Sequence, residues 1–443
     1  YELEFKKVDA SVGGHLYFNK ENGSNKYTVS LKDNSTIDVG GDMTHRYQSG
    51  SQNYELEIEK DVTLTIGGDY FIEKNGGSNR LQFEAKDNVT IDVDGDVSIL
   101  HTSGSSGMKL DFDDHTTLSM DGNLAMEWTG GSNPMDFTFG DGSGSHDDTL
   151  RVGGYFHFGA TTGWSGSYRL DATINRSAIT FIGGDIAAVH AHGRLLFNNN
   201  DAELVLNGSG QQQIQGESTG SLFVGYRHLE VDNSYTHADS SMMYGVELMG
   251  PIELESELRL TNGTVRTTYA NWLRVASGAD VEGGNTSAYI DGPLEIEGNN
   301  SLFFPVGRYN FYAPIEIHNQ APNSSSNAYR AAYFPEGYVD TTTGPVLHHV
   351  SRNEHWELDR LAGTADVEYE LYWYDHVWSG ISDLADLTIA LFDSTSGQWE
   401  NVGGTSVSGT LEEGSIRSNT RQGQFGPAPF GSVGGGNILP IEL

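Results

Sequence analysis

A short β-branched segment that ends in Gly-Gly or Asp-Gly recurs along the first part of the chain and constrains its fold more than any other feature. The clearest copies are residues 36–42, 63–69, 90–96 and 117–123. The second residue of each pair is glycine, and the steps are of 27 residues: Gly14, Gly41, Gly68, Gly95 and Gly122. Looser copies end at Gly154, Gly184 and Gly208. A fixed period of this length predicts a stacked repeat fold.

One copy of the repeat holds three extended segments separated by turns. In residues 81–107 these segments are 81–85, 89–93 and 97–100, and apolar residues alternate with polar ones in the first two. Three strands and three turns per period describe one rung of a parallel β-helix, whose copies bury a common face by stacking. Four residues should form an inward ladder: Ile37, Leu64, Ile91 and Leu118. We expect each corner glycine to provide a positive φ for a tight bend.

Composition agrees with an all-β protein and excludes several classes of partner. The chain has 443 residues, of which 56 are glycine, 61 are acidic and 25 are basic, so its formal net charge is −36. Such an acidic surface argues against binding to nucleic acid or to an anionic membrane. The chain contains no cysteine, which excludes disulfides and thiolate metal sites. No apolar run approaches the ~20 residues of a membrane-spanning helix.

An acidic residue follows three of the regular corners. Asp42, Asp69 and Asp96 should lie on one edge of the stack, about 4.8 Å apart. Carboxylates this close are candidate ligands for a hard cation such as Ca²⁺. The alternative is that each aspartate caps its turn through its side chain, and the absence of the regular calcium-binding nonapeptide favours this. We expect the fold to require no cofactor, and Ca²⁺ is the one candidate ion.

The composition changes beyond residue 215, and we predict three regions. Regular rungs cover residues 1–215, an irregular continuation of the β-helix covers 216–300, and a different domain covers 301–443. Ten of the 11 prolines lie at or beyond Pro251. In the last region the strands lengthen and lose the period, as at 369–374 and 387–392. This pattern predicts a C-terminal antiparallel β-sandwich.

A series of short motifs in the second half is distinctive in its order. It comprises residues 260–264 (LTNGT), 289–294 (YIDGPL), 303–307 (FFPVG), 312–315 (YAPI), 351–360 (SRNEHWELDR), 425–427 (FGP) and 437–443 (NILPIEL). Together they resemble the C-terminal region of large secreted surface proteins of Bacteroidetes, just before a type IX secretion sorting domain. The resemblance covers roughly residues 220–443. It implies export across the outer membrane and a cell-surface or extracellular location, with a cleaved signal peptide and a cleaved sorting domain, and it implies no catalytic residues.

Motifs that would indicate an enzyme lack their required context. Residues 216–220 match Gly-x-Ser-x-Gly, but a strand rather than a helix is expected to follow. His348 and His349 should point to opposite faces of a strand, which would prevent chelation by the pair, and His355 is expected in the core beside Trp356.

We therefore predict a non-enzymatic, extracellular structural or adhesive protein. The alternative is a carbohydrate-binding or carbohydrate-active β-helix protein, and four aromatic residues are candidates for stacking on sugars: Trp128, Trp164, Tyr155 and Tyr168. Surface glycans are in either case candidate partners.

The start of the chain resembles the inside of a rung. Residues 1–5 (YELEF) match residues 54–58 (YELEI), so an uncapped rung is expected there. The chain should then polymerise end to end into a filament or stalk, with two groups at the interface: Tyr1, Leu3 and Phe5, and Ile438, Leu439 and Ile441 of the apolar tail. The alternative is that these residues are part of a longer chain in which further rungs cover this end.

Overall fold

The computed structural model describes residues 1–140, 147–162, 168–176, 178–198, 202–216, 222–235, 244–404, 406–437 and 439. By its internal contacts the chain divides into two compact units, Tyr1–Asn233 and Ser234–Leu443. Throughout the described ranges the secondary structure is β, apart from one four-residue helix, α1 (His376–Ser379). The all-β prediction and the parallel β-solenoid are thus confirmed.

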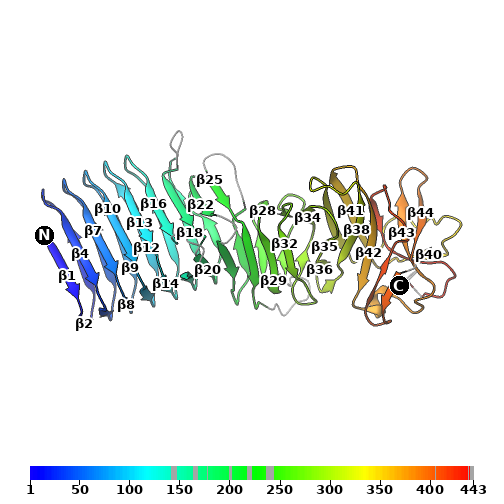
Figure 1. Cartoon of the computed structure of the whole chain (residues 1–443), viewed down its shortest axis with the longest axis horizontal. Coiled ribbons are helices and arrows are strands. Elements are labelled where there is room, and N and C mark those ends of the chain that lie inside the picture. The colour runs from blue at the N-terminus through cyan, green and yellow to red at the C-terminus, as the bar shows by residue number, and fades with distance from the viewer. Residues whose placement is uncertain are drawn as a thin grey trace. The chain divides into compact units, whose positions relative to one another are not determined.

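The first unit consists of three parallel sheets, to which each rung contributes one strand (Figure 1). The first sheet contains β1 (Glu2–Lys6), β4 (Tyr27–Lys32), β7 (Tyr54–Glu59), β10 (Leu81–Lys86), β13 (Met108–Phe112), β16 (Met135–Phe139), β19 (Leu170–Ile174), β22 (Gly193–Phe197) and β25 (Leu222–Gly225). The second contains β2 (Asp9–Val12), β5 (Thr36–Val39), β8 (Val62–Ile66), β11 (Val89–Val93), β14 (Thr116–Met120), β17 (Asp148–Val152), β20 (Ala178–Ile182), β23 (Glu203–Leu206) and β26 (His228–Asp232). The third contains β3 (Leu16–Lys20), β6 (Met43–Tyr47), β9 (Tyr70–Asn75), β12 (Val97–Ser103), β15 (Leu124–Trp128), β18 (Phe156–Ala160), β21 (Ile186–Ala188) and β24 (Gln212–Ile214).

Equivalent residues of successive rungs pair directly, so like side chains stack. Leu64 pairs with Ile37 on one side and with Ile91 on the other, and Leu118 continues the row to Leu150. All five side chains are buried. The inward ladder predicted from the period is therefore confirmed, and it persists where the period lengthens beyond Gly122.

The corner glycines are required for close approach and not for a positive φ, which corrects the prediction made for them. None of the four from Gly41 to Gly122 has a positive φ. The amide of Gly95 donates to Gly68 O at 3.1 Å, which brings successive corners together. A Cβ added to Gly95 would lie 2.7 Å from that oxygen and would also overlap Oδ1 of Asp69. A side chain at this position would therefore push two rungs apart.

Positive φ occurs instead at the other two corners of the rung, at glycines such as Gly50 and Gly104 after the third sheet and at non-glycine residues between the first and second sheets. Two consecutive residues there have positive φ, for example Asp87 (64°) and Asn88 (68°). The equivalent pairs in neighbouring rungs are Asp33–Asn34, Lys60–Asp61 and Asp114–His115. Asp, Asn and His tolerate this conformation better than most residues do, so this corner needs no glycine.

The third corner is filled by large polar and aromatic side chains in one column. In-register pairing stacks Lys20, Tyr47, Lys74, His101 and Trp128. Lys74 Nζ lies 4.9 Å from the centre of the Tyr47 ring, and burial lowers the pKa of Lys74 to about 8. Lys20 Nζ donates to Gln52 O at 2.6 Å and to Asn53 O at 3.0 Å. Lys74 Nζ donates to Gly76 O in the same way, so both lysines bind carbonyl groups of the turns instead of pointing to solvent.

The second unit begins with further parallel rungs and then changes to antiparallel pairing. Parallel pairs join β27 (Val246–Leu248), β30 (Val265–Arg266), β33 (Ile290–Asp291) and β36 (Val306–Arg308), then β28 (Ile252–Leu254), β31 (Leu273–Val275) and β34 (Leu294–Glu297), and also β29 (Glu257–Asn262) and β32 (Asp280–Gly283). A two-residue strand, β37 (Phe311–Tyr312), is antiparallel to β36. The three-region division predicted from composition stays a prediction.

Three groups of antiparallel strands make up the rest of this unit. β34 continues to β39 (Ala328–Phe334), β41 (His355–Ala362) and β47 (Gly426–Ala428). A second sheet has the order β35 (Leu302–Phe304), β38 (Ile315–Ala321), β42 (Asp366–Trp373), β46 (Gly414–Arg417) and β45 (Ser406–Gly409). A third has the order β40 (His349–Val350), β48 (Phe430–Ser432), β43 (Leu387–Asp393) and β44 (Gln398–Gly403). Trp356 and Trp373 are buried from different sheets and both pack edge-on against Phe430.

The steric role of the corner glycine predicts a position-dependent effect of alanine. We expect Gly95→Ala to lower the free energy of unfolding by roughly 1–3 kcal/mol, because the added methyl group overpacks the rung contact. Gly14→Ala is the matched control, since Gly14 occupies the equivalent corner position but has no atom within 4 Å of an added Cβ. Thermal and denaturant unfolding measure both variants. Equal effects of the two substitutions would contradict the steric explanation.

Candidate functional site

The aspartates at the corners form a hydrogen-bonded ladder along the stack. Oδ1 of Asp42 accepts from the amide of Asp69 at 3.0 Å, and Oδ1 of Asp69 accepts from the amide of Asp96 at 2.9 Å. Asp96 in turn accepts from the amide of Asn123 at 2.7 Å. Each carboxylate thus satisfies an amide of the next rung, one turn further along the chain.

The ladder does not depend on a negative charge at every position. Asn123 takes the place of an aspartate, and its Oδ1 accepts from the amide of Tyr155 at 2.8 Å. At the other end, His15 Nδ1 accepts from the amide of Asp42 at 2.9 Å. What the members share is an acceptor atom at the same place, which is the capping role that the sequence left open beside cation binding. Calcium binding by Asp42, Asp69 and Asp96 stays a prediction.

The residues predicted to form an assembly interface have different environments. Tyr1 is 85% exposed and Leu3 is 39% exposed, and Phe5 is half-buried. Leu439 is buried, and its amide donates to Gly380 O at 3.1 Å. Ile438 and Ile441 lie outside the described residues. Assembly through these two groups stays a prediction.

Two of the three described aromatic residues considered for sugar stacking are buried or half-buried. Trp128 is buried, and its Nε1 donates to Asn133 O at 3.1 Å. Tyr168 is half-buried, and Trp164 lies outside the described residues. Tyr155 is 46% exposed and stacks on His157 with the rings nearly parallel. Among the described members of this group, Tyr155 is therefore the most exposed.

The histidines singled out in the sequence are placed differently from one another. His348 precedes β40, so strand alternation does not separate it from His349, and their Nδ1 atoms are 2.9 Å apart. This corrects the expectation that the two rings point to opposite faces. His355 is buried against Phe334 with Nδ1 2.7 Å from Glu336 O, which confirms its packing role. In the Gly-x-Ser-x-Gly motif, residues 217–220 lie outside the described residues, and a strand, β25, follows the motif.

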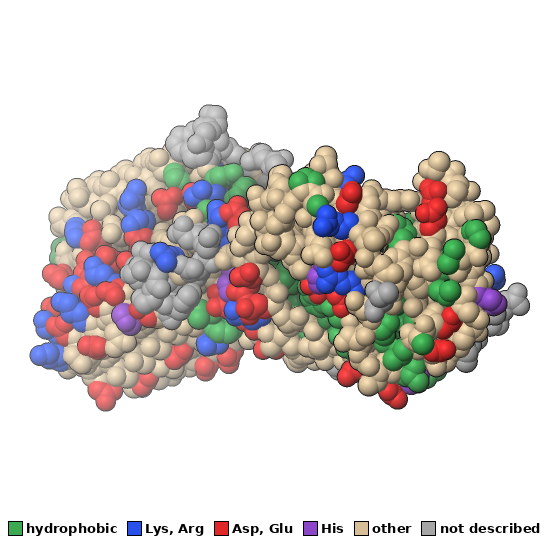
Figure 2. All heavy atoms as spheres, turned by 45° about the vertical axis from the view of Figure 1, so that its right-hand side comes forward, with side chains coloured by type: hydrophobic (Ala, Val, Ile, Leu, Met, Phe, Trp, Pro, Cys, Tyr) green, Lys and Arg blue, Asp and Glu red, His purple; other side chains and the backbone are tan. Residues whose placement is uncertain are grey.

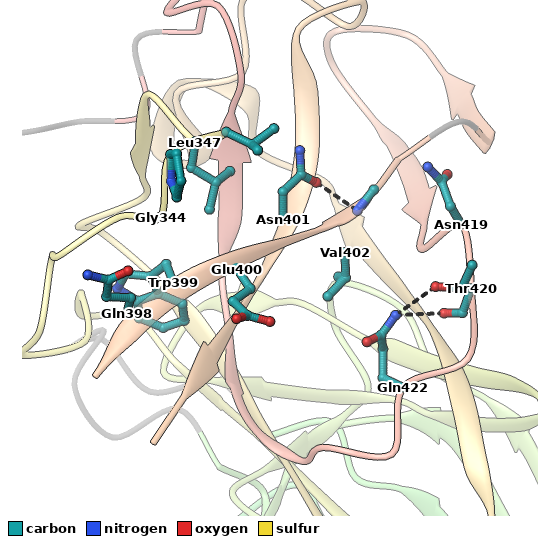
Figure 3. A pocket seen from close by; sticks show the side chains of 13 residues that line it. Gly344, Leu347, Gln398, Trp399, Glu400, Asn401, Val402, Asn419, Thr420 and Gln422 are labelled. Carbon is teal, nitrogen blue, oxygen red and sulfur yellow. Dashed lines mark hydrogen bonds between the residues drawn. The ribbon is translucent and has the colours of Figure 1, made fainter. Parts of the chain in front are cut away.

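A polar cavity of about 610 Å³ lies beside the edge strand β44 of the second unit (Figure 3). Its wall includes Leu347, Gln398, Trp399, Glu400, Asn401, Val402, Asn419, Thr420 and Gln422. This volume is in the range of small-molecule sites. Trp399 offers no ring face for stacking, because its side chain is fully buried and its Nε1 donates to Asp340 O at 2.8 Å.

Several polar groups of this cavity are held in fixed orientations. Oδ1 of Asn401 accepts from the amide of Gly403 and from Oγ1 of Thr388, both at 2.7 Å. Nε2 of Gln422 donates to the carbonyl oxygen and to Oγ1 of Thr420, as Figure 3 shows. Glu400 and Gln398 on the same strand are exposed. The cavity can therefore offer an amide and a carboxylate to a polar ligand.

One buried carboxyl group in the second unit has a strongly raised pKa. Glu354 is 2% exposed, and burial raises its pKa from 4.5 to about 7. Its Oε2 accepts from the hydroxyl of Tyr333 at 2.7 Å, and that hydroxyl also accepts from Trp378 Nε1. The environment therefore favours the neutral acid near neutral pH.

Sequence reasoning did not find the cavity beside β44, because its wall comes from three segments that are distant in the chain. It also missed a group on the second sheet of this unit, Glu316, His318 and Glu370, of which only the Glu-x-His spacing was visible as a signal. Glu370 is brought beside them only by strand pairing.

Comparisons with known proteins add no identification. No protein-family model matches the chain, and no curated protein and no solved structure was found to be significantly similar to it. Within the described residues, none of the helical structure is long and apolar enough to cross a membrane.

The ladder predicts different results for two substitutions of Asp69. Asp69→Ala removes the acceptor for the amide of Asp96 and should cost about 1 kcal/mol, whereas Asp69→Asn keeps an acceptor, as Asn123 does, and should leave stability unchanged. Melting temperatures with and without excess chelator measure both. A chelator-induced decrease for the wild-type chain that Asp69→Asn abolishes would instead establish the calcium prediction.

The raised pKa of Glu354 predicts a pH-dependent stability. Between pH 4.5 and about 7 the unfolded chain loses this proton while the folded chain keeps it, so stability falls as pH rises. The loss is complete above the folded pKa and is on the order of 3 kcal/mol. Glu354→Gln cannot ionise and should show a smaller decrease in melting temperature between pH 5 and pH 8. Exposed Glu400→Gln is the control, and equal pH dependence in all three proteins would refute the assignment.

Proposed function

We propose that this chain is an extracellular structural or adhesive protein and not an enzyme. The observation that carries the proposal is the continuous, in-register stack of rungs in the first unit, tied together by the Asp ladder. Such a stack transmits its geometry from rung to rung and can serve as a rigid spacer.

The outer faces of the rungs support this interpretation. Ion pairs join neighbouring rungs, with N–O distances of 2.7 Å for Lys6–Asp33, 2.7 Å for Lys32–Glu57 and 2.6 Å for Arg46–Glu73. Acidic and basic side chains are interspersed on the face seen in Figure 2. Each exposed pair contributes little alone, but the excess of acid that remains favours a soluble surface that repels nonspecific contacts.

We further propose that the antiparallel part of the second unit is a β-sandwich. Support comes from buried aromatic side chains on different sheets, Trp356 and Trp373, that share Phe430 as a neighbour. Export by the type IX route and a cell-surface location are proposed from the resemblance of residues 220–443 alone.

For the chain of residues 1–443 we propose self-association end to end through the first rung. The exposed side chains of Tyr1, which precedes β1, of Leu3 on β1 and of Tyr17 on β3 (64% exposed) support this proposal. A strand edge of this kind can pair with another chain. We thus propose a second copy of this chain as the main partner and surface glycans as further partners.

Carbohydrate binding is the second candidate function, and the cavity beside β44 favours it. A polar wall with an amide of Asn401 and the carboxylate of Glu400 can bind sugar hydroxyl groups. The buried position of Trp399 removes the usual stacking contact, so this function ranks second.

Electron microscopy and light scattering over a concentration series test the proposed assembly. We expect the 443-residue chain to form particles that elongate as concentration rises, and we expect Leu3→Glu to prevent this. Tyr155→Glu is the control, since Tyr155 is also exposed but lies far along the stack from β1.

Three results would contradict or redirect this proposal. A monomer at every concentration contradicts self-association, and so does native material of higher mass with further rungs before Tyr1. Binding of the monomer to polysaccharide, lost on Asn401→Ala, would favour the second candidate.

A further inference from the structure

A group of ionisable side chains lies together on the outward face of the sheet formed by β35, β38, β42, β46 and β45. Alternation along β38 buries Ile315 and Ile317 and turns Glu316 and His318 outward. On the neighbouring strand β42, Glu370 points to the same outward side. The three side chains are therefore collected by pairing of two antiparallel strands.

The ligand atoms of the three residues are close to one another. One atom from each residue can be chosen so that all lie within 4.8 Å of one another. His318 Nε2 is 2.7 Å from Glu370 Oε2, and His318 Nδ1 is 3.6 Å from Glu316 Oε1. The side chains are only 13% exposed for His318, 20% for Glu316 and 16% for Glu370. Within the described parts of the chain, this is the one such group of three or more potential metal ligands.

Two carboxylates of this group lie opposite each other in the sheet. Glu316 and Glu370 pair directly across the two strands, where two like charges destabilise a sheet. Arg417 lies opposite Glu370 on β46, but its guanidinium binds Glu368 instead, at 2.6 and 2.8 Å. His318 is thus the basic group that approaches both carboxylates directly.

Surrounding hydroxyl groups hold the ligands in place. The hydroxyl of Tyr372 donates to Glu316 Oε2 at 2.9 Å, and that of Ser415 donates to Glu370 Oε1 at 2.6 Å. Ser301 Oγ is 2.8 Å from His318 Nδ1. When Nδ1 carries a proton toward Ser301, Nε2 and Glu370 Oε2 are both acceptors, and a proton or a metal ion between them satisfies both. This is the orienting pattern found around metal ligands in proteins.

We propose that Glu316, His318 and Glu370 form a binding site for a divalent transition metal of the Zn²⁺ class. One imidazole nitrogen of His318 and one oxygen of each carboxylate are the ligands, and water fills the remaining position. The imidazole ligand selects against Ca²⁺ and Mg²⁺, which take oxygen ligands.

The site must rearrange when it binds the ion, because Glu316 approaches Nδ1 of His318 whereas Glu370 approaches Nε2. Zn–N and Zn–O distances near 2 Å place tetrahedral ligand atoms about 3.3 Å apart. The contact of 2.7 Å between His318 and Glu370 must therefore open, while the group as a whole contracts from its 4.8 Å limit. A hollow of about 370 Å³ beside Glu370, lined also by Ser406 and Arg417, offers a path for the ion.

A proton relay of Ser301, His318 and Glu370 is the other arrangement that these distances suggest. In such a relay His318 would activate the Ser301 hydroxyl. Glu316, which approaches the same Nδ1, has no part in a relay but is a ligand in a metal site. The second carboxylate is therefore the observation that favours the metal.

Calorimetric titration of the purified chain with ZnCl₂ tests the proposal. His348→Ala and His349→Ala are introduced into every protein first, because that neighbouring pair of imidazoles can bind Zn²⁺ separately. In this background we expect one Zn²⁺ per chain. His318→Ala and Glu370→Gln should each weaken binding at least tenfold, and Tyr372→Phe should weaken it about tenfold through lost orientation.

Two controls in the same unit match the substituted groups. His376→Ala removes an imidazole and Glu400→Gln removes a carboxylate, both outside the site, and neither should change the affinity. Melting temperatures without metal confirm that each variant is folded. Titration with Co²⁺ gives a second readout, a visible absorption band that His318→Ala should abolish.

The proposal is overturned if the chain shows no saturable Zn²⁺ binding in this background. It is equally overturned if binding is unchanged in folded His318→Ala and Glu370→Gln variants. Because the substituted residues belong to the second unit and β1 belongs to the first, these results are independent of the self-association test.

Discussion

The structure of the first unit depends on direct pairing between equivalent residues of successive rungs. Parallel strands in exact 27-residue register place Leu64 against Ile37 and Ile91, so each apolar side chain finds a partner of its own kind. The same register places the side chain of each corner aspartate within hydrogen-bonding distance of the backbone amide in the next rung. One constraint, the constant length of a rung, therefore governs both the core and the polar edge.

The Gly-Asp corner of each rung shows how closely the core and the polar edge are connected. Asp69 Oδ1 occupies the space where a side chain on Gly95 would lie and binds the amide of Asp96 there. The glycine and the aspartate of the repeat are thus a pair that belongs to adjacent rungs. Where asparagine replaces aspartate, at Asn123, the hydrogen bond persists, so its acceptor geometry is the shared requirement. This explains why the motif survives beyond the strict period.

The second unit is organised differently, and its candidate sites follow from that. Antiparallel sheets bury one face and leave the other free to collect polar side chains from strands that are distant in sequence. Glu316, His318 and Glu370 come together in this way, as do the walls of the cavity beside β44. In the solenoid, by contrast, the neighbours of a residue along the stack occupy the equivalent position of the adjacent rungs. Side chains therefore form rows along the stack and not clusters that combine several positions of the repeat.

The sequence alone determined the period, the three strands of a rung and the inward ladder, because a repeat must stack on itself and alternation then fixes which side chains face inward. It did not determine why the corners contain glycine: the backbone of Gly95 has ordinary φ, and the requirement comes from the rung before it. Only the tertiary structure could decide this, as it decided that His348 and His349 face each other and that Glu370 joins Glu316 and His318. The alternation of residues within a segment predicts its secondary structure and its buried face. Contacts between segments depend on strand register and on packing, and the sequence of a single segment does not determine these.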